Sequence, residues 1–193
     1  MAGGTARRYG GLRKGLLEVG GRRMLDRVVD ALTAATHTPP LLVASDPEAA
    51  TWRRGLLAVP DVRTGCGSLG GIYTAVVSGP GAVLCVAWDM PFVTPELLAG
   101  LAQGSPGFDA FLPESNGPRG MEPLCAVYGP GVAPAIERRF ASGELETVAF
   151  HPEVRVGVLP LERVRRCGDP DILFFNVNSP EDLERAEGLA QRL

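Results

Sequence analysis

GAVLCVAWD, residues 81–89, is the stretch that decides the fold of this chain. No charge interrupts its apolar residues before Asp89, whereas a strand with one solvated face would alternate apolar and polar side chains. The run therefore predicts a parallel strand that is buried on both faces. Asp89 ends the run and Pro91 turns the chain after it, so we expect the carboxylate at an edge of the sheet.

Helical and strand patterns alternate on both sides of this run. Residues 23–35 predict an amphipathic helix, and Ser179, Pro180 and Asp182 predict the capping box of the last helix, residues 178–193. The other predicted helices are 47–56, 72–78, one with Thr94 as N-cap, and 132–140, and the other predicted strands are 39–46, 56–61, 108–115, 122–129, 154–160 and 172–177. This order predicts a three-layer α/β/α sandwich with a mostly parallel sheet, and the lack of a linker predicts a single domain over residues 1–193.

The composition is that of an ordinary globular domain. The chain has 193 residues, of which 45% are hydrophobic and 21% charged, with a formal net charge of −3. This balance predicts no nucleic-acid partner and no membrane partner, and no apolar stretch is long enough to span a bilayer. The four cysteines lie far apart without a C-x-x-C pair, which excludes a compact zinc motif and gives no disulfide framework. The expected compartment is the reducing cytoplasm.

The first fourteen residues, MAGGTARRYGGLRK, contain four glycines and four basic residues. Glycine lets backbone N–H groups approach an anion closely, so Gly3, Gly4, Arg8 and Lys14 together suit an extended polyphosphate. The loop is neither a Walker A motif nor a G-x-G-x-x-G motif. On these residues alone, a solvated basic loop explains the stretch equally well.

Asp89 is the candidate metal ligand. Ligands of α/β sheets bind at the carboxyl ends of the strands, which places the opening loop and the loops at Asp61, Asp89 and Asn176 along one rim. A carboxylate at that rim suits Mg²⁺ bound to phosphate oxygens, because Mg²⁺ keeps several waters and needs few protein ligands. The alternative is that Asp89 only caps the turn that follows it.

Several motifs resemble those of the molybdenum cofactor guanylyltransferases, in order and over essentially the whole chain. They are AGGTARRYGG, LLEVGGRRMLDRVVDAL, GSLGGIYTAV, WDMPF, PLCAVY and FFNVNSPEDLERAE. The resemblance implies a Rossmann-like nucleotidyltransferase that transfers GMP from GTP to the molybdopterin cofactor, with Mg²⁺ as cofactor and pyrophosphate as the second product. The protein partners that it implies are other molybdenum cofactor biosynthesis proteins and the molybdoenzymes that receive the product.

The resemblance also assigns site residues. The implied nucleotide-binding residues are Ala2, Gly3, Gly4, Lys14, Asp61 and Asp89. In this assignment Lys14 and Arg8 hold the β- and γ-phosphates, and Asp89 holds Mg²⁺. The attacking group is already an anionic phosphate, so no general base is needed, and we expect His37 and His151 to be bystanders.

Three residues depart from the family's pattern. Arg13 and Tyr9 do so in the opening loop, and Glu122 stands where relatives more often have Gln or His. Because that position faces the acceptor, the identity of the acceptor is the more open question. The alternatives are a cytidylyltransferase for the same cofactor, a sugar-phosphate nucleotidyltransferase, or a relative that binds nucleotide without turnover. The presence of both Lys14 and Asp89 argues against the last.

The start of the chain also departs from the resemblance. Relatives place a short apolar strand before A-G-G, at the centre of the sheet, where this sequence has only Met1. Without such a strand, two rows of backbone N–H and C=O groups lack partners and the core lacks apolar side chains. We therefore expect the first strand to be missing and the chain as written to be marginally stable or insoluble. We expect about six to ten upstream residues to restore a stable, GTP-binding protein.

Overall fold

The structure is a computed structural model and describes residues 13–193. The helices are α1 (Met24–Thr36), α2 (Gly67–Ser78), α3 (Pro95–Gly104), α4 (Ala133–Ser142), α5 (Leu161–Arg165), α6 (Pro170–Leu173) and α7 (Pro180–Ala190). The strands are β1 (Glu18–Val19), β2 (Arg22–Arg23), β3 (Leu41–Val43), β4 (Leu57–Val59), β5 (Val83–Val86), β6 (Ala110–Pro113), β7 (Cys125–Tyr128) and β8 (Val156–Leu159). No helix in residues 13–193 combines the length and apolar character that a membrane crossing requires.

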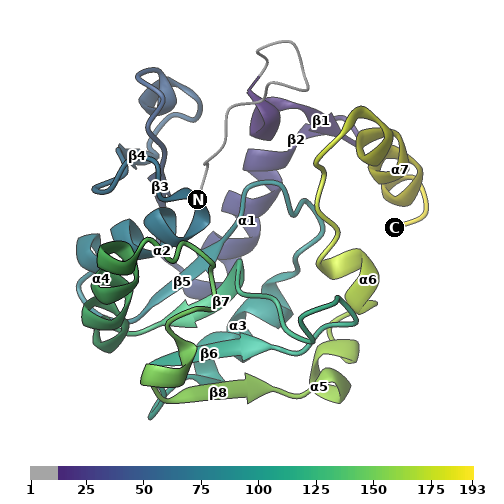
Figure 1. The fold of residues 1–193 in the computed structure, drawn as a ribbon. Coiled ribbons are helices and arrows are strands. Elements are labelled where there is room, and N and C mark those ends of the chain that lie inside the picture. Colours follow the sequence, from purple (N-terminus) through teal and green to yellow (C-terminus); the bar gives the residue numbers. More distant parts are fainter. Residues whose placement is uncertain (1–12) are drawn as a thin grey trace.

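Four strands form the main sheet, in the order β5-β7-β6-β8 (Figure 1). β7 runs antiparallel to both β5 and β6, and β8 runs parallel to β6, so β5, β6 and β8 point the same way. β3 and β4 form a separate parallel pair, and β1 and β2 form a hairpin. The predicted parallel direction therefore holds for the main sheet except at β7.

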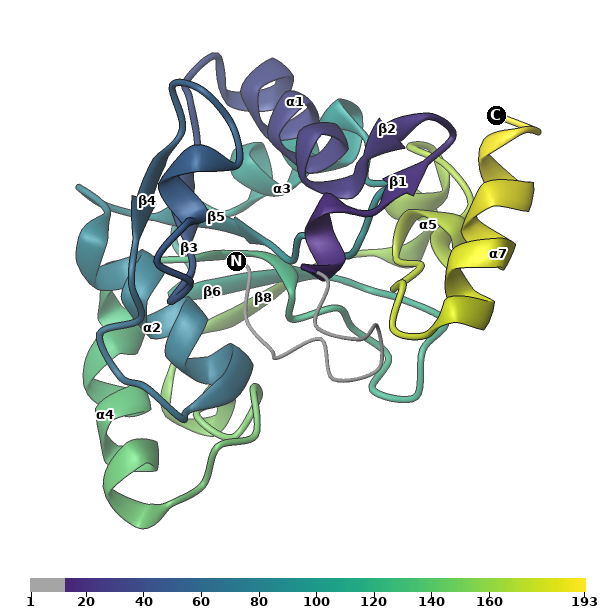
Figure 2. The same cartoon turned by 90° about the horizontal axis from the view of Figure 1, so that it is seen from above.

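Alternating side chains give the main sheet two buried faces. On one face, Phe111, Cys125 and Val127 belong to a core cluster with side chains of α1 and α3. On the other face, Cys85 and Leu112 belong to a cluster with side chains of α2 and α4. Figure 2 shows α1 and α3 on one side of the strands and α2 and α4 on the other. The predicted three-layer arrangement is confirmed.

Capping residues set the starts of two predicted helices. The Oγ1 atom of Thr94 accepts a hydrogen bond from the N–H of Leu97 at the start of α3. At the start of α7, Ser179 and Asp182 form the predicted capping box. α2 begins at Gly67, ahead of the predicted residues 72–78, so part of its glycine-rich approach is helical.

The predicted helix over residues 47–56 is wrong. Only Ala49–Thr51 forms a short 3-10 helix in this segment. Gly55 has a φ of 80°, which an α-helix does not allow, and the guanidinium of Arg53 forms ion pairs with Asp26 and Asp30 of α1. The segment makes only short-range hydrogen bonds of its own, such as the one from the N–H of Leu56 to the carbonyl of Arg53, and the ion pairs join it to α1.

The predicted strand over residues 172–177 is also wrong. The side chain of Asp169 caps α6 by accepting a hydrogen bond from the N–H of Asp171 at 3.0 Å, and Pro170 fits the first helical position. Beyond α6, the N–H of Val177 donates to the carbonyl of Asp89 at 3.0 Å. The segment after α6 therefore bonds to the loop that follows β5 instead of adding a strand.

Candidate functional site

Asp89 lies in the loop that follows β5. The N–H of Val177 donates to its carbonyl, which fixes the backbone, and its Oδ2 lies 2.6 Å from the Nζ of Lys14. The side chains of Lys14 and Asp89 are 14% and 17% exposed, so water screens this ion pair little. The structure thus brings together the two predicted site residues, which lie 75 positions apart in the sequence.

Asn178 completes a contact between three segments of the chain. Its Oδ1 accepts a second hydrogen bond from the Nζ of Lys14, at 2.6 Å. The N-terminus of α7 holds Asn178 in place, because the N–H groups of Asn178 and Ser179 both donate to Oδ2 of Asp182 at 3.0 Å. We call Lys14, Asp89 and Asn178 the Lys14 cluster.

Gly15 allows Lys14 to reach this position. Lys14–Leu16 is a short 3-10 helix, and Gly15 lies against the indole of Trp88, the residue before Asp89. A Cβ atom on Gly15 would lie 2.1 Å from that ring, so only glycine lets the backbone come this close. The Trp88 ring stacks in turn on Trp52, with 5.3 Å between the ring centroids.

Arg13 contacts a second loop at the same edge. Its Nε donates to Oδ2 of Asp46 at 2.7 Å, and its Nη2 lies 3.0 Å from a carboxylate oxygen of Glu48. Asp46 follows β3 and Asp89 follows β5, yet they contact the adjacent residues Arg13 and Lys14. The carboxyl ends of β3 and β5 therefore lie at one edge of the molecule, as the predicted rim requires.

Asp61 lies at this edge as well, but apart from the Lys14 cluster. It follows β4, and its Oδ2 accepts a hydrogen bond from the Oγ of Ser45 at 2.8 Å, while its N–H donates to the same Oγ at 3.1 Å. Within residues 13–193, no hydrogen bond or ion pair joins Asp61 to Lys14 or Asp89. The role of Asp61 in nucleotide binding stays a prediction.

Glu122 adds a carboxyl group that interacts electrostatically with Asp89. Burial raises the pKa of Glu122, and the negative charge of Asp89 acts in the same direction. The N–H of Leu124 opposes this change in pKa by donating to Oε1 of Glu122 at 3.1 Å, and the positive charge of Arg119 opposes it too. Glu122 therefore binds a proton more readily than an exposed glutamate, and when protonated it can donate a hydrogen bond.

Asp89 fits a hard cation that takes few ligands from the protein. Its Oδ1 atom is buried and accepts no hydrogen bond from the described part of the chain. A buried carboxylate oxygen without a partner is costly, so a ligand that binds it is favoured. No group of three or more His, Cys, Asp or Glu side chains within residues 13–193 could hold a metal. A cation at Asp89 would take its remaining ligands from water and phosphate oxygens, as Mg²⁺ commonly does.

Several predicted site residues cannot be placed. Ala2, Gly3, Gly4 and Arg8 lie outside the described residues, so their phosphate contacts stay predictions. The two histidines are placed, and neither contacts the Lys14 cluster. His37 ends α1 in a left-handed conformation, and His151 is half-buried, with its pKa lowered by burial.

Sequence reasoning missed Asn178 and Ser45. It placed the loop at Asn176 on the rim, but the Nδ2 of Asn176 donates to the carbonyl of Phe174 at 3.0 Å and serves its own turn. The predicted capping box was a signal for Asn178. The box makes Ser179 the N-cap of α7, so Asn178 directly before it lies at the N-terminus of that helix. The signal for Ser45 was weaker, a small polar residue directly after an apolar strand.

The fold and the site are those expected of a nucleotidyltransferase, an α/β sandwich with a lysine and a carboxylate side by side at the carboxyl edge of its sheet. The family model of the MobA-like NTP transferase domain matches residues 1–153. The chain belongs to this family. The resemblance inferred from the motifs, and the predicted enzyme class with it, are confirmed.

Two curated relatives and one solved structure show how far the similarity extends. The chain is 37% identical over 192 residues to a "Probable molybdenum cofactor guanylyltransferase" of Pelotomaculum thermopropionicum, covering 99% of this chain and 91% of that protein. It is 34% identical over 190 residues to the "Molybdenum cofactor guanylyltransferase" of Desulfosudis oleivorans, covering 97% and 92%. The crystal structure of molybdopterin-guanine dinucleotide biosynthesis protein A from Archaeoglobus fulgidus superposes with a TM-score of 0.83 at 29% identity, covering 100% and 97%.

Proposed function

We propose that this protein transfers GMP from GTP to the molybdopterin cofactor and releases pyrophosphate. The observation that carries the proposal is the Lys14 cluster at the carboxyl edge of the sheet. Phosphoryl transfer relies on positioning and on charge around the phosphates, and the cluster supplies a cation and a ligand for a metal. The choice of GTP and of the molybdopterin acceptor rests on the names of the relatives.

In the proposed reaction, a terminal phosphate oxygen of the acceptor attacks the α-phosphorus of GTP in line. A new P–O bond forms as the bond from the α-phosphorus to its bridging oxygen breaks. The bridging oxygen keeps both electrons of that bond and leaves in pyrophosphate. The attacking phosphate is already anionic, so the reaction needs no general base. The absence of histidine from the contacts of the Lys14 cluster, among the described residues, agrees with this chemistry.

Lys14 is the proposed anchor of the β- and γ-phosphates. A lysine ammonium has three N–H donors, and Asp89 and Asn178 accept two of them. A polyphosphate can accept the third, and its greater negative charge lets it compete with Asp89 for another. Asn178 keeps the ammonium at the site while this exchange takes place. Arg8 is proposed to hold the same phosphates, as the resemblance implies.

Asp89 is the proposed ligand of Mg²⁺. When bound, the metal would supply positive charge that offsets the negative charge developing on the phosphate oxygens. The chain contributes a fixed carboxylate, because Val177 holds the Asp89 carbonyl and Lys14 holds Oδ2, which leaves Oδ1 without a partner among the described residues. The arrangement requires no further protein ligand, since Mg²⁺ accepts water and phosphate oxygens.

The reducing cytoplasm is the proposed compartment. All four cysteines are free, and the two most buried, Cys85 and Cys125, pack in the core. Burial raises the pKa of Cys85 to about 12, so its thiol stays protonated and unreactive at neutral pH. Other molybdenum cofactor biosynthesis proteins and recipient molybdoenzymes are the proposed protein partners.

A panel of nucleotides tests the proposed function. Pyrophosphate release would be measured with GTP, CTP, ATP and UTP, each with and without the molybdopterin cofactor, and the product identified by mass spectrometry. We expect release that depends on both GTP and the acceptor, together with the guanine dinucleotide product. A preference for CTP would assign a cytidylyltransferase, and nucleotide binding without release would assign a catalytically inactive relative.

A further inference from the structure

Residues 114–122, between β6 and β7, form a hairpin at the same edge of the sheet as Asp89. β5 and β6 point the same way, so the chain leaves β6 at the edge where the chain leaving β5 carries Asp89. Directly after the hairpin, the carbonyl of Leu124 accepts a hydrogen bond from the N–H of Ala87 at 2.8 Å. This bond joins the end of the segment to the loop of Asp89. We call residues 114–122 the β6–β7 hairpin.

Backbone contacts fix the shape of the β6–β7 hairpin. Glu114 and Met121 form an antiparallel bridge at its base. The N–H of Gly120 donates to the carbonyl of Gly117 at 2.9 Å and closes the turn at its tip. The φ of Gly120 is 67°, a conformation that glycine adopts readily and other residues rarely do. The turn thus places Arg119, the residue before Gly120, at the tip of the hairpin.

Arg119 is held only weakly in this position. Its only ion pair within residues 13–193 is with Glu146, where 3.8 Å separates Nη2 from Oε1, longer than a hydrogen bond. The side chains of Arg119 and Glu146 are 58% and 71% exposed, so water screens their attraction. Arg119 can therefore exchange Glu146 for an anionic ligand at little cost.

An anionic acceptor needs a cation at this part of the edge. Asp89 and Glu122 both bring carboxyl groups there, and their negative charge would repel a phosphate. The loop of Asp89, residues 87–94, has no basic residue, and neither has the segment 174–179 that bonds to it. The β6–β7 hairpin has one, Arg119. The charge of Arg119 acts on the Glu122 carboxyl as that of Asp89 does, so it reaches this part of the site.

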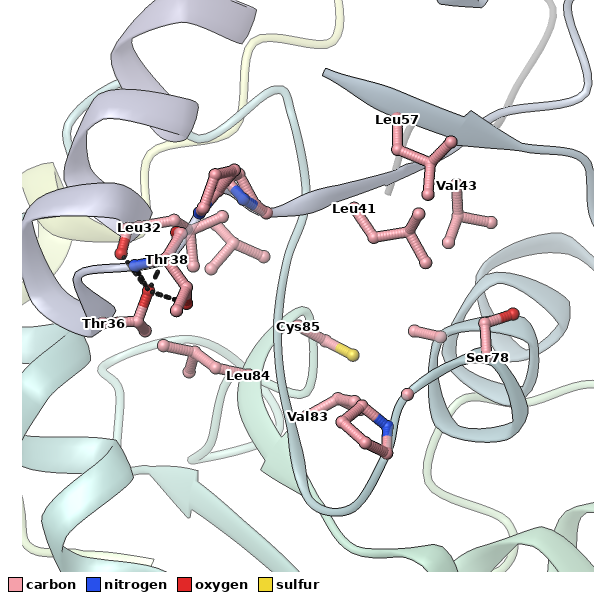
Figure 3. A pocket seen from close by; sticks show the side chains of 16 residues that line it. Leu32, Thr36, Thr38, Leu41, Val43, Leu57, Ser78, Val83, Leu84 and Cys85 are labelled. Carbon is pink, nitrogen blue, oxygen red and sulfur yellow. Dashed lines mark hydrogen bonds between the residues drawn. The ribbon is translucent and has the colours of Figure 1, made fainter. Parts of the chain in front are cut away.

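The apolar cavity between β3 and β5 does not suit such an acceptor. It has a volume of about 390 Å³, and Figure 3 shows Leu41 and Val83 on opposite sides of it. Among residues 13–193, its lining has apolar or hydroxyl-bearing side chains and no charged one. A phosphate that leaves water needs a cation or several hydrogen-bond donors. The β6–β7 hairpin is therefore the better place for the acceptor.

We propose that Arg119 binds the terminal phosphate of the acceptor, an inference that rests on the proposed function. A guanidinium can donate two parallel hydrogen bonds to two oxygens of one phosphate. The third free oxygen of that phosphate then attacks the α-phosphorus of GTP, in the reaction described above. In this arrangement Arg119 anchors the acceptor, and Lys14 anchors the nucleotide on the other side of Asp89.

Initial-rate kinetics with both substrates varied tests the proposal, with GTP as donor and the molybdopterin cofactor as acceptor. Arg119→Ala should raise the KM for the acceptor about 10- to 100-fold, because the phosphate loses two charge-assisted hydrogen bonds. The KM for GTP should change by less than about twofold, since the nucleotide does not contact Arg119. Arg119→Lys keeps the charge without the paired geometry, so its KM for the acceptor should lie between those of Arg119→Ala and the natural protein.

Two further variants separate binding from a structural role. Arg138→Ala in α4 removes an arginine of matching exposure, 59%, that pairs with Glu153, and it should change neither KM. Glu146→Gln removes the partner of Arg119 and frees its guanidinium, so it should lower the KM for the acceptor about two- to threefold. If the ion pair only held the hairpin in shape, Glu146→Gln and Arg119→Ala would raise that KM together.

Three results would overturn the inference while leaving the proposed function intact. They are an unchanged KM for the acceptor in Arg119→Ala, an equal rise in both of its KM values, and a rise for Glu146→Gln that matches that of Arg119→Ala. In each of them the natural protein still releases pyrophosphate when GTP and the acceptor are both present. If the natural protein releases none, the proposed function fails and this inference fails with it.

Discussion

At the scale of single residues, Lys14 is the centre of the site because it links two segments that the fold brings in from far along the chain. Its ammonium contacts Asp89 across 75 positions and Asn178 across 164 positions. The ammonium donates to one carboxylate oxygen and one amide oxygen, which leaves its third N–H for the phosphate oxygen of the proposed substrate.

Replacing Asp89 by asparagine should lower kcat by about 10²–10³-fold, because the variant loses the charge that binds the metal. The amide keeps the size of the side chain, so circular dichroism should show an intact fold. Asp171→Asn is the matched control, since that exposed side chain contacts Asn116 rather than the Lys14 cluster. Near-normal turnover of Asp89→Asn at saturating Mg²⁺ would remove Asp89 from the metal site.

Lys14→Ala should lower kcat/KM by about 10- to 100-fold, with a higher KM for the nucleotide and a lower kcat. The neighbouring substitution Arg13→Ala should have a much smaller effect, because Arg13 pairs with Asp46 on another loop and at a partly exposed position. Steady-state kinetics of both variants at several nucleotide concentrations checks the difference. Equal losses would mean that Arg13 also contacts the substrate.

The sequence predicted part of this site. Lys14 and Asp89 could be predicted because glycines and an apolar strand mark the positions of the residues beside them. The contact between Asn178 and Lys14 could not be predicted, since it depends on where the irregular segment after α6 crosses the edge of the sheet. The hydrogen bond from Val177 to Asp89 sets that crossing, and nothing in the local sequence encodes its partner.

At the scale of elements, the 3-10 turn Lys14–Leu16 depends on one glycine. Gly15→Ala should reduce kcat/KM about as much as Lys14→Ala, because the added Cβ would lie 2.1 Å from the ring of Trp88 and push the turn away. Overpacking of this kind costs about 1–3 kcal/mol, which urea unfolding would detect.

The matched control for Gly15→Ala is Gly100→Ala in α3, where no atom lies within 4 Å of the added Cβ. That substitution should stabilise the protein by about 0.5–1 kcal/mol, because alanine is the better helix former. If Gly15→Ala keeps both its stability and its activity, the close approach to Trp88 does not position Lys14.

The capping box of α7 connects helix stability to the site. Ser179→Ala should cost about 0.5–2 kcal/mol of unfolding free energy, because the N–H of Asp182 loses its acceptor. It should also raise the KM for the nucleotide, since Asn178 is held by the same helix start. Ser142→Ala, at the C-terminal end of α4, serves as control and should change neither the unfolding free energy nor the KM. An unchanged KM would show that Asn178 keeps its position without the cap.

Elements with a strong local pattern were predictable, and elements set by long-range contacts were not. The capping box and apolar periodicity of α7 and α1 are local, and both helices are confirmed. Residues 47–56 have a helical composition, but Arg53 bonds to α1 and Gly55 breaks the helix. Residues 172–177 are apolar enough for a strand, yet Asp169 and Pro170 start a short helix that uses part of the run.

At the scale of the whole molecule, aromatic side chains link the β3–β4 pair to the main sheet. Trp52, between β3 and β4, stacks on Trp88, which follows β5, and the two are the only tryptophans of the chain. The layered class of the fold followed from the alternation of helices and strands. The antiparallel direction of β7 could not be predicted, because a buried antiparallel strand has the same apolar pattern as a parallel one.

Two carboxyl groups in different parts of the fold should give opposite dependences of stability on pH. Burial raises the pKa of Glu122, so its ionised form costs stability at neutral pH. The hydrogen bonds from Arg155 lower the pKa of Asp109, so its ionised form contributes stability. The destabilisation by ionised Glu122 fades as the pH falls through its raised pKa toward about 4.3. The stabilisation by ionised Asp109 is lost only as the pH falls below about 3.9.

We therefore expect Glu122→Gln to be more stable than the natural protein at pH 7, with a difference that shrinks as the pH falls toward about 4. Asp109→Asn should be less stable at pH 7, and its difference should persist to about pH 4 and shrink only below it. Urea unfolding followed by tryptophan fluorescence between about pH 3 and pH 8 measures both differences. A Glu122→Gln variant that is less stable at pH 7 would show that the ionised carboxylate is satisfied where it lies. Its hydrogen bond from Leu124 would then outweigh both its burial and the charge of Asp89.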